Sequence, residues 1–200
     1  MTCATALTVM TACSQSSSQS TGTTTSSKTS AVTATTSKKT NKSNSNYFTS
    51  KDSDTSYNES SATKIKLSGL SADVSGDGAA LSGSTVTISK AGTYVISGES
   101  DGVQIKVDAG DSDDVHIVLD GATMTNTNAA INATKAGHVY LTLKDGTTNT
   151  LSDSSSNSDE DADAVIFSKG DLTINGSGTL NIDAKKNNGI KANDSLHMTG

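Results

Sequence analysis

After residue 64 the sequence repeats itself about every 24 residues, and this repeat restricts the possible folds more than any other feature. Tyr94–Gly98 returns as Ile117–Gly121, 23 positions further along the chain. Leu172–Gly176 returns as Leu196–Gly200, 24 positions further along. A repeat of this length predicts an architecture that adds one similar unit at a time, each unit contacting its neighbours.

One step in the repeat is longer than the others. From Leu143 to Ile174 the offset is 31 positions, and the step contains a Ser- and Asp-rich stretch at residues 152–163. We interpret this stretch as an insertion at a corner between two strands.

Within each period the apolar residues alternate with Thr, Asn, His or Ser, which indicates strands with one buried face. Each period holds three short strands joined by Gly, Asn and Asp corners. The sequence therefore predicts an all-β fold over residues 63–200, a right-handed parallel β-helix (a solenoid with about 24 residues per coil) that is truncated at its C-terminus. The residues expected to point inward are Ile96, Ile117, Leu119, Leu141, Leu143, Ile174 and Met198.

The first 62 residues differ in composition from the repeat region. Residues 1–13 are interpreted as the remnant of a lipoprotein signal, because Met10–Cys13 resembles a bacterial lipobox, although no positive charge precedes it. Residues 14–62 are more than half Ser and Thr and predict a disordered linker. We expect Cys13 to carry lipid and to hold the protein outside the cell, on the membrane. The alternative is an ordinary N-terminus with a chance cysteine.

The charge of the repeat region excludes one class of partner. Residues 64–200 contain 10 Lys and 18 Asp or Glu, and the chain has no Arg. Binding to a phosphate backbone requires clustered basic residues, so nucleic acid is not expected as a partner. Both cysteines lie in the first 13 residues, which excludes a disulfide or a thiolate metal site in the repeat region.

The 152–163 insertion concentrates carboxylates, and hard oxygen ligands of this kind suit Ca²⁺. The candidate metal ligands are Asp153, Asp159, Glu160, Asp161 and Asp163. The alternative, of equal weight, is a solvated loop. A smaller cluster at residues 111–114 is interpreted as a turn. Asn126, Thr150 and Asn181 predict a structural polar ladder at one corner.

Five motifs in a fixed order carry a family resemblance: Ala91–Gly98, Val118–Gly121, Leu143–Leu151, Phe167–Gly178 and Asn187–Ile190. In this order they resemble the bacterial carbohydrate-binding domain-containing proteins, pectate-lyase-like β-helix proteins that bind polygalacturonate. The resemblance implies a secreted or lipid-anchored binder of acidic polysaccharide such as pectin, with bound calcium and no established lyase activity. A bridging cation would also let an acidic domain approach an acidic sugar.

Two alternatives to a monomeric binding protein remain. A polysaccharide lyase needs a base, and without Arg the candidates are Lys185 and Lys186 beside Asp183. A cell-surface adhesin or structural β-helix would need no specific glycan. His116, His138 and His197 have no Cys or Ser partner that would indicate a catalytic triad, and no metal-ligand spacing, and His116 and His197 are expected to face outward.

The lipid anchor can be tested directly in cells that express the gene with its own upstream sequence. We expect the wild-type protein in the membrane fraction and Cys13→Ala in the soluble fraction, because acylation needs the thiol. Cys3→Ala is the matched control and should remain with membranes. A Cys13→Ala protein that still partitions with membranes would remove the anchor.

Overall fold

The alternating segments form strands, as expected, and the computed structural model describes residues 47–200. Cys13 and residues 14–46 of the predicted linker lie outside the described residues. The elements in chain order are η2 (Ser50–Ser53), β1 (Thr63–Gly69), β2 (Ser71–Ser75), β3 (Ala79–Ser82), β4 (Thr85–Ile88), β5 (Gly92–Asp101), β6 (Gln104–Asp108), β7 (Asp114–Thr125), β8 (Ile131–Lys135), β9 (His138–Leu143), β10 (Thr148–Ser152), β11 (Ala164–Ser168), β12 (Asp171–Gly176), β13 (Thr179–Asp183), β14 (Asn188–Ala192) and β15 (Leu196–Met198).

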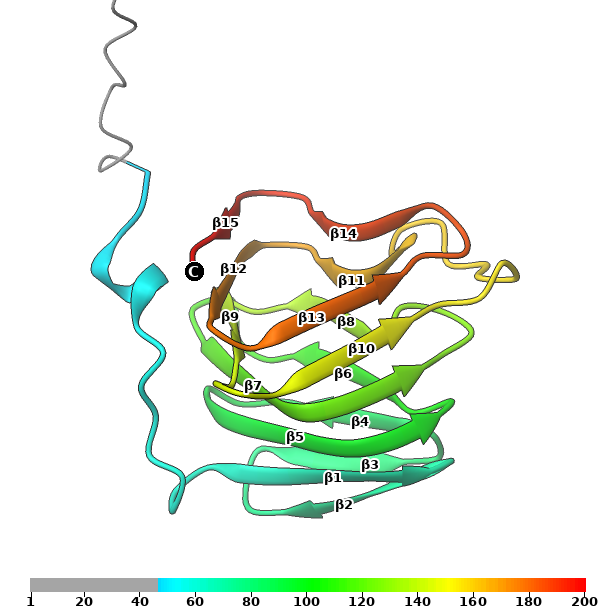
Figure 1. The fold of residues 1–200 in the computed structure, drawn as a ribbon, viewed down its shortest axis with the longest axis horizontal. Coiled ribbons are helices and arrows are strands. Elements are labelled where there is room, and N and C mark those ends of the chain that lie inside the picture. Colours follow the sequence, from blue (N-terminus) through cyan, green and yellow to red (C-terminus); the bar gives the residue numbers. More distant parts are fainter. Residues whose placement is uncertain (1–46) are drawn as a thin grey trace, which may run out of the picture. The chain divides into compact units, whose positions relative to one another are not determined.

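The strands form two mixed sheets (Figure 1). The nine-stranded sheet has the order β15-β12-β9-β7-β5-β1-β2, with β10 joined to β7 and β13 joined to β10. The six-stranded sheet has the order β14-β11-β8-β6-β4-β3. Most neighbours are parallel, whereas β1–β2 and β3–β4 are antiparallel pairs.

The prediction of an all-β fold is confirmed, but the predicted right-handed parallel β-helix is wrong. Within residues 47–200 the strands form two open mixed sheets and no solenoid sheet. The first and third predicted strands of a period do not separate, because β5 and β7 continue through Gly98 and Gly121 as single strands of 10 and 12 residues. Both glycines have positive φ, at 87° and 71°, which lets the backbone bend and stay hydrogen-bonded.

The repeat itself appears as strand register. Val115 lies opposite Val139 in the parallel pair β7–β9, and Leu172 lies opposite Leu196 in β12–β15. Equivalent repeat positions therefore stack directly on one another. This is the arrangement that parallel hydrogen bonding between similar segments produces.

The predicted offset of 31 for the longer step of the repeat is confirmed for one pair of strands and wrong for another. Thr148 pairs with Thr179 in β10–β13, which is the expected offset of 31, but Leu143 pairs with Gly176 and not with Ile174. The reason is local: the segment from Leu143 to Thr148 is two residues longer than the segment from Gly176 to Thr179.

The core lies between the two sheets, and six of the seven predicted inward residues belong to it: Ile96, Ile117, Leu119, Leu141, Leu143 and Ile174. The prediction for Met198 is wrong, because its side chain is 57% exposed. Met198 lies in β15, which pairs only with β12 and has no described neighbour on its other side.

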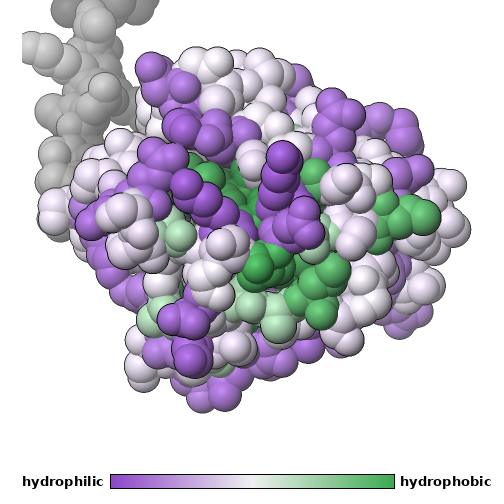
Figure 2. Space-filling model, turned by 90° about the horizontal axis from the view of Figure 1, so that it is seen from below, coloured by the Kyte–Doolittle hydropathy of each residue, from purple (hydrophilic) through white to green (hydrophobic). Residues whose placement is uncertain are grey.

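The opposite end of the core is covered by the outermost strands β2 and β3. Figure 2 shows apolar side chains at the centre of this end, surrounded by hydrophilic ones. Val74, Ala79 and Leu81 pack against the core and are partly buried, and Leu70 is 73% exposed. The two antiparallel pairs thus close the N-terminal end incompletely.

Residues 47–62 correct the predicted boundary of the linker. We call this segment the N-terminal arm. It contains η2 and runs beside the nine-stranded sheet from β15 towards β1 (Figure 1). Asp52 within it is buried, and Tyr57 packs against Val95 and Val118. The ordered structure therefore begins before residue 62, although the arm has the composition of a linker.

Burial of Ile117 provides a test of the core. Its side chain has no exposed surface, so Ile117→Asp would bury an unpaired charge and should lower the free energy of unfolding by more than about 4 kcal/mol. Thr125→Asp, at an exposed position of the same strand, should change it by less than about 1 kcal/mol. Urea denaturation followed by circular dichroism measures both. Equal midpoints for the two variants would contradict this assignment of the core.

Candidate functional site

The outward face of the nine-stranded sheet carries polar and aromatic side chains where the N-terminal arm crosses it. Because side chains alternate along a strand, Thr173 and Asn175 of β12 share this face. Their neighbours His138 and Tyr140 of β9 lie at the paired or adjacent positions of the parallel register. The repeat that stacks the core residues therefore also aligns these outward residues.

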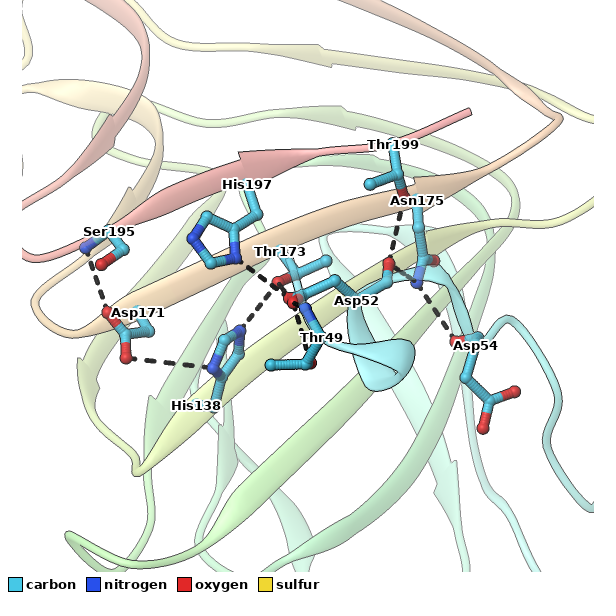
Figure 3. Close-up of polar contacts among 10 residues, drawn as sticks. All are labelled: Thr49, Asp52, Asp54, His138, Asp171, Thr173, Asn175, Ser195, His197 and Thr199. Atoms are coloured by element: carbon cyan, nitrogen blue, oxygen red, sulfur yellow. Dashed lines mark hydrogen bonds and ion pairs between the residues drawn. The ribbon is translucent and has the colours of Figure 1, made fainter. Parts of the chain in front are cut away.

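Asp52 of the arm is the centre of this site (Figure 3). Its side chain is 1% exposed. Its Oδ1 accepts a hydrogen bond of 2.5 Å from the Thr173 hydroxyl and lies 3.1 Å from Nδ1 of His197. Its Oδ2 accepts bonds from the backbone N–H and hydroxyl of Thr49, at 2.7 and 2.9 Å. One arm carboxylate thus receives donors from two strands of the sheet and from its own turn.

These donors keep Asp52 ionised. Burial by itself would raise the pKa of this carboxyl, because it disfavours the charged form. The hydrogen bonds from Thr173, Thr49 and His197 outweigh burial and hold the pKa of Asp52 well below its usual value. A buried charge without such donors would be strongly destabilising.

The backbone of the arm is held by the same face. Nδ2 of Asn175 donates to the carbonyl oxygens of Asp52 and Asp54, at 3.1 and 3.2 Å, and the Thr199 hydroxyl donates to that of Asp52 at 3.0 Å. Oδ1 of Asn175 accepts from the Thr142 hydroxyl at 2.6 Å. The amide of Asn175 is therefore oriented by the sheet, so that its donor group points towards the arm (Figure 3).

Two histidines extend the network across neighbouring strands. Nε2 of His138 lies 2.9 Å from the Thr173 hydroxyl, and Nε2 of His116 lies 2.7 Å from that of Thr142. Burial lowers the pKa of both imidazoles, against the weaker opposing effect of nearby carboxylates. At neutral pH both rings therefore act as uncharged hydrogen-bonding groups.

Aromatic surface lies next to the polar groups. The rings of His138 and Tyr140 stack with centroids 4.0 Å apart and an angle of 9° between their planes. Nζ of Lys51 sits 4.8 Å from the centroid of the Tyr140 ring and also pairs with Asp114. The arm therefore covers both the donors and the ring of this face.

The predicted calcium ligands lie elsewhere, in the loop between β10 and β11, and their contacts differ from one to the next. Asp153 is buried and accepts from the backbone N–H of Lys185 at 2.6 Å. Asp159 accepts from the backbone N–H of Asp161 at 3.1 Å. Asp163 forms an ion pair of 2.7 Å with Lys191.

Glu160 and Asp161 of the same loop are exposed. Among residues 47–200, no three His, Cys, Asp or Glu side chains are arranged as a metal site. The carboxylates of the loop do not converge on one point, so calcium binding there stays a prediction.

The other singled-out residues have structural roles or lie apart from the arm. Asp113 accepts from the backbone N–H of Gly110 at 2.9 Å, as the turn interpretation expects. Thr150 pairs with Asn181, but Asn126 does not join them and donates to the Gly102 carbonyl. The three-residue ladder is therefore wrong at Asn126.

The candidate bases of a lyase also lie away from the arm. Lys185 and Lys186 are exposed in the turn between β13 and β14, and Lys185 pairs with Asp183.

Sequence reasoning expected His116 and His197 to face outward, and their contacts with the arm confirm this. It missed Asp52, Thr173 and Asn175. Thr173 and Asn175 occupy the polar positions of an alternating strand, so a signal existed for them. Asp52 stands among Ser, Thr and Lys in a linker-like stretch, where no local pattern separates it from its neighbours.

The pKa shifts predict that docking of the arm depends on pH. The pKa of Asp52 is lowered in the folded state, so its contribution is present above the ordinary value of 3.8 and is lost as pH falls below it. The pKa values of His116 and His138 are also lowered, so their contribution is present above the ordinary value of 6.5 and is lost as pH falls below it. We expect amide protection in residues 49–54 to fall at least about tenfold between pH 7 and pH 2, measured by hydrogen exchange.

The groups that face Asp52 in this titration are His138, His197, Lys51 and Tyr140. Asp54→Asn is the control, because its exposed carboxylate bonds only within the arm, to Ser56. It should keep the acid limb of the profile, whereas Asp52→Asn should flatten that limb. Equal protection at pH 7 and pH 2 would contradict the docking role of Asp52.

No helix within residues 47–200 is long and apolar enough to cross a membrane. A curated protein of Acetivibrio thermocellus, described as a carbohydrate-binding domain-containing protein, is 39% identical over 130 residues, which cover 62% of this chain and 46% of the relative. The chain thus spans about half the length of that relative.

A solved structure is similar in fold as well as in sequence. It is described as a polysaccharide lyase-like protein from C. thermocellum, in a gadolinium derivative. The TM-score is 0.67 at 36% identity, over 70% of this chain and 59% of the other. A family model for carbohydrate-binding domain-containing proteins matches residues 82–200, more than half of the chain. This chain belongs to the family of carbohydrate-binding domain-containing proteins.

Proposed function

We propose that this chain is a non-catalytic, monomeric binding protein for acidic polysaccharide of the polygalacturonate type. The observation that carries the proposal is the outward face of β7, β9, β12 and β15, where imidazole, hydroxyl, amide and aromatic groups lie in adjacent register. Few well-placed polar groups beside an aromatic surface are typical of sugar-binding sites. Membership of the family supports a carbohydrate as the ligand.

An acidic glycan is favoured over a neutral one by the donors on this face. Thr173, Asn175 and His197 hydrogen-bond the carboxylate and the backbone carbonyl of one arm residue. Donors that satisfy a carboxylate discriminate against ligands that lack one, because the donors would then remain unpaired. A neutral polysaccharide carries hydroxyl groups but no carboxylate, so it lacks the acceptor that these donors satisfy.

A polysaccharide lyase is the second candidate, and the solved neighbour described as lyase-like favours it. Lyase chemistry removes a proton next to a carboxylate and needs a base within hydrogen-bond reach. The candidate bases Lys185 and Lys186 lie in the turn between β13 and β14, on elements other than those beneath the arm. This separation supports the binding role.

Two further parts of the proposal concern context. Calcium would bridge the acidic protein, with a formal charge of −6, to an acidic polymer. Lipid on Cys13 would hold the domain at the outer cell surface, so that captured polymer stays near the cell. Neither part depends on the geometry of the arm.

A polysaccharide retention experiment tests the function. We expect the full chain to be retained on immobilised polygalacturonate, with retention reduced at least about tenfold by a calcium chelator. Fully methyl-esterified pectin is the matched control and should retain little protein, because its carboxylates are masked. Equal retention on both polymers would refute the acidic specificity.

The same samples test for catalysis. Lyase action leaves unsaturated sugars that absorb in the ultraviolet, and we expect no such product after prolonged incubation. Steady product release that disappears in Lys185→Ala or Lys186→Ala would establish the lyase instead. Retention that is indifferent to chelator would remove calcium from the proposal and leave the binding function standing.

A further inference from the structure

The N-terminal arm occupies the face that the proposed function assigns to the glycan. We propose that the groove beneath the arm is a subsite for the carboxylate of one uronate residue, and that Asp52 fills it as an internal ligand until the polysaccharide displaces it. This inference rests on the proposed function and adds to it a located subsite and a built-in competitor.

The interacting groups divide between the sheet, which supplies donors, and the arm, which supplies acceptors. The donors Thr173 and Asn175 belong to β12, which pairs with a strand on each side, and both are almost fully buried. The acceptors are the carboxylate and the carbonyl oxygen of Asp52 in the arm. A uronate presents a similar set of acceptors, a carboxylate beside ring and hydroxyl oxygens. The sheet is therefore already arranged for such a ligand.

The arm also covers the aromatic surface that a sugar ring would use. Nζ of Lys51 lies over the face of the Tyr140 ring at 4.8 Å, held there by Asp114. When the arm leaves, this ring face and the Thr173 hydroxyl become free together. A pyranose ring can then pack on Tyr140 while its carboxylate bonds to Thr173 and His197.

The contacts of the arm are of a kind that a ligand can replace. Around Asp52 they are hydrogen bonds and ion pairs, and water or a ligand can also satisfy these groups. Tyr57 packs with Val95 and Val118 at the other end, whereas near Asp52 the aromatic contact is that of Phe48 with His197, at 5.2 Å between ring centroids. The arm can therefore lift at Asp52 and remain attached at Tyr57.

The groove extends beyond the arm on both sides. A hollow of about 270 Å³ adjoins Lys51 and is lined in part by His116 and Tyr140. A second, of about 290 Å³, adjoins Ser53 and is lined in part by Asn175 and Thr199. The hollow beside Lys51 offers space for a neighbouring sugar residue of a polymer that displaces Asp52.

Calorimetric titration with trigalacturonate tests the subsite on the full chain. Asp52→Ala should bind trigalacturonate at least about tenfold more tightly than wild type, because the ligand no longer competes with the arm. Glu59→Ala is the matched control: its exposed carboxylate lies on the same arm, 4.0 Å from Nζ of Lys64, so its affinity should equal that of wild type. Adding Thr173→Val to Asp52→Ala should abolish the gain.

A second measurement uses the wild-type chain and so does not depend on how a variant folds. Saturating trigalacturonate should accelerate tryptic cleavage after Lys51 several-fold, because the lifted arm is exposed to protease. Trimethyl-esterified trigalacturonate should not. Unchanged cleavage at saturation would overturn the displacement.

The outcomes separate this inference from the proposed function. Retention on polygalacturonate with no affinity gain in Asp52→Ala would overturn the subsite and leave the function intact. Absence of retention on polygalacturonate in both wild type and Asp52→Ala would overturn both. Tighter binding in Asp52→Ala together with ligand-induced cleavage after Lys51 would establish the arm as an internal competitor.

Discussion

Parallel hydrogen bonding between successive repeats is the constraint on which the rest of this structure depends. It places residues about 24 positions apart directly opposite one another, as Val115 and Val139 show. Apolar residues then stack inward and build one continuous core between two sheets. The same register aligns the outward residues, so that groups from separate repeats meet on one face. Core and candidate site are two consequences of a single pairing rule, because side chains alternate between the faces of each strand.

The N-terminal arm depends on that aligned face. Asp52 can be buried and ionised only because Thr173, His197 and Thr49 supply donors to its carboxylate. The arm has too few apolar residues to dock by hydrophobic burial along its length, apart from Phe48 and Tyr57. The arm is therefore held in place by hydrogen bonds to specific polar partners. This explains how a segment with the composition of a linker becomes part of the folded structure.

The corrections share a physical origin. The β-helix was predicted from short strands separated by glycine, but Gly98 and Gly121 bend strands without ending them, and two pairs at the N-terminal end are antiparallel. The carboxylates of the loop between β10 and β11 looked like a cluster in sequence. In space Asp153 and Asp163 point to different partners, Lys185 and Lys191. Local composition shows which groups are present, but partners distant in sequence decide what each group does.

The sequence by itself determined the all-β class, the repeat, and nearly all of the predicted core, because alternation and periodicity are local patterns that parallel pairing must respect. It also determined the carbohydrate-binding family through motifs in a fixed order. Only the tertiary structure decided that the strands form two mixed sheets and that Asp52 reaches Thr173, 121 positions away. The physical reason is that a hydrogen bond between distant residues leaves no periodic trace in the chain. It exists only when the sheet has formed and the arm lies across it.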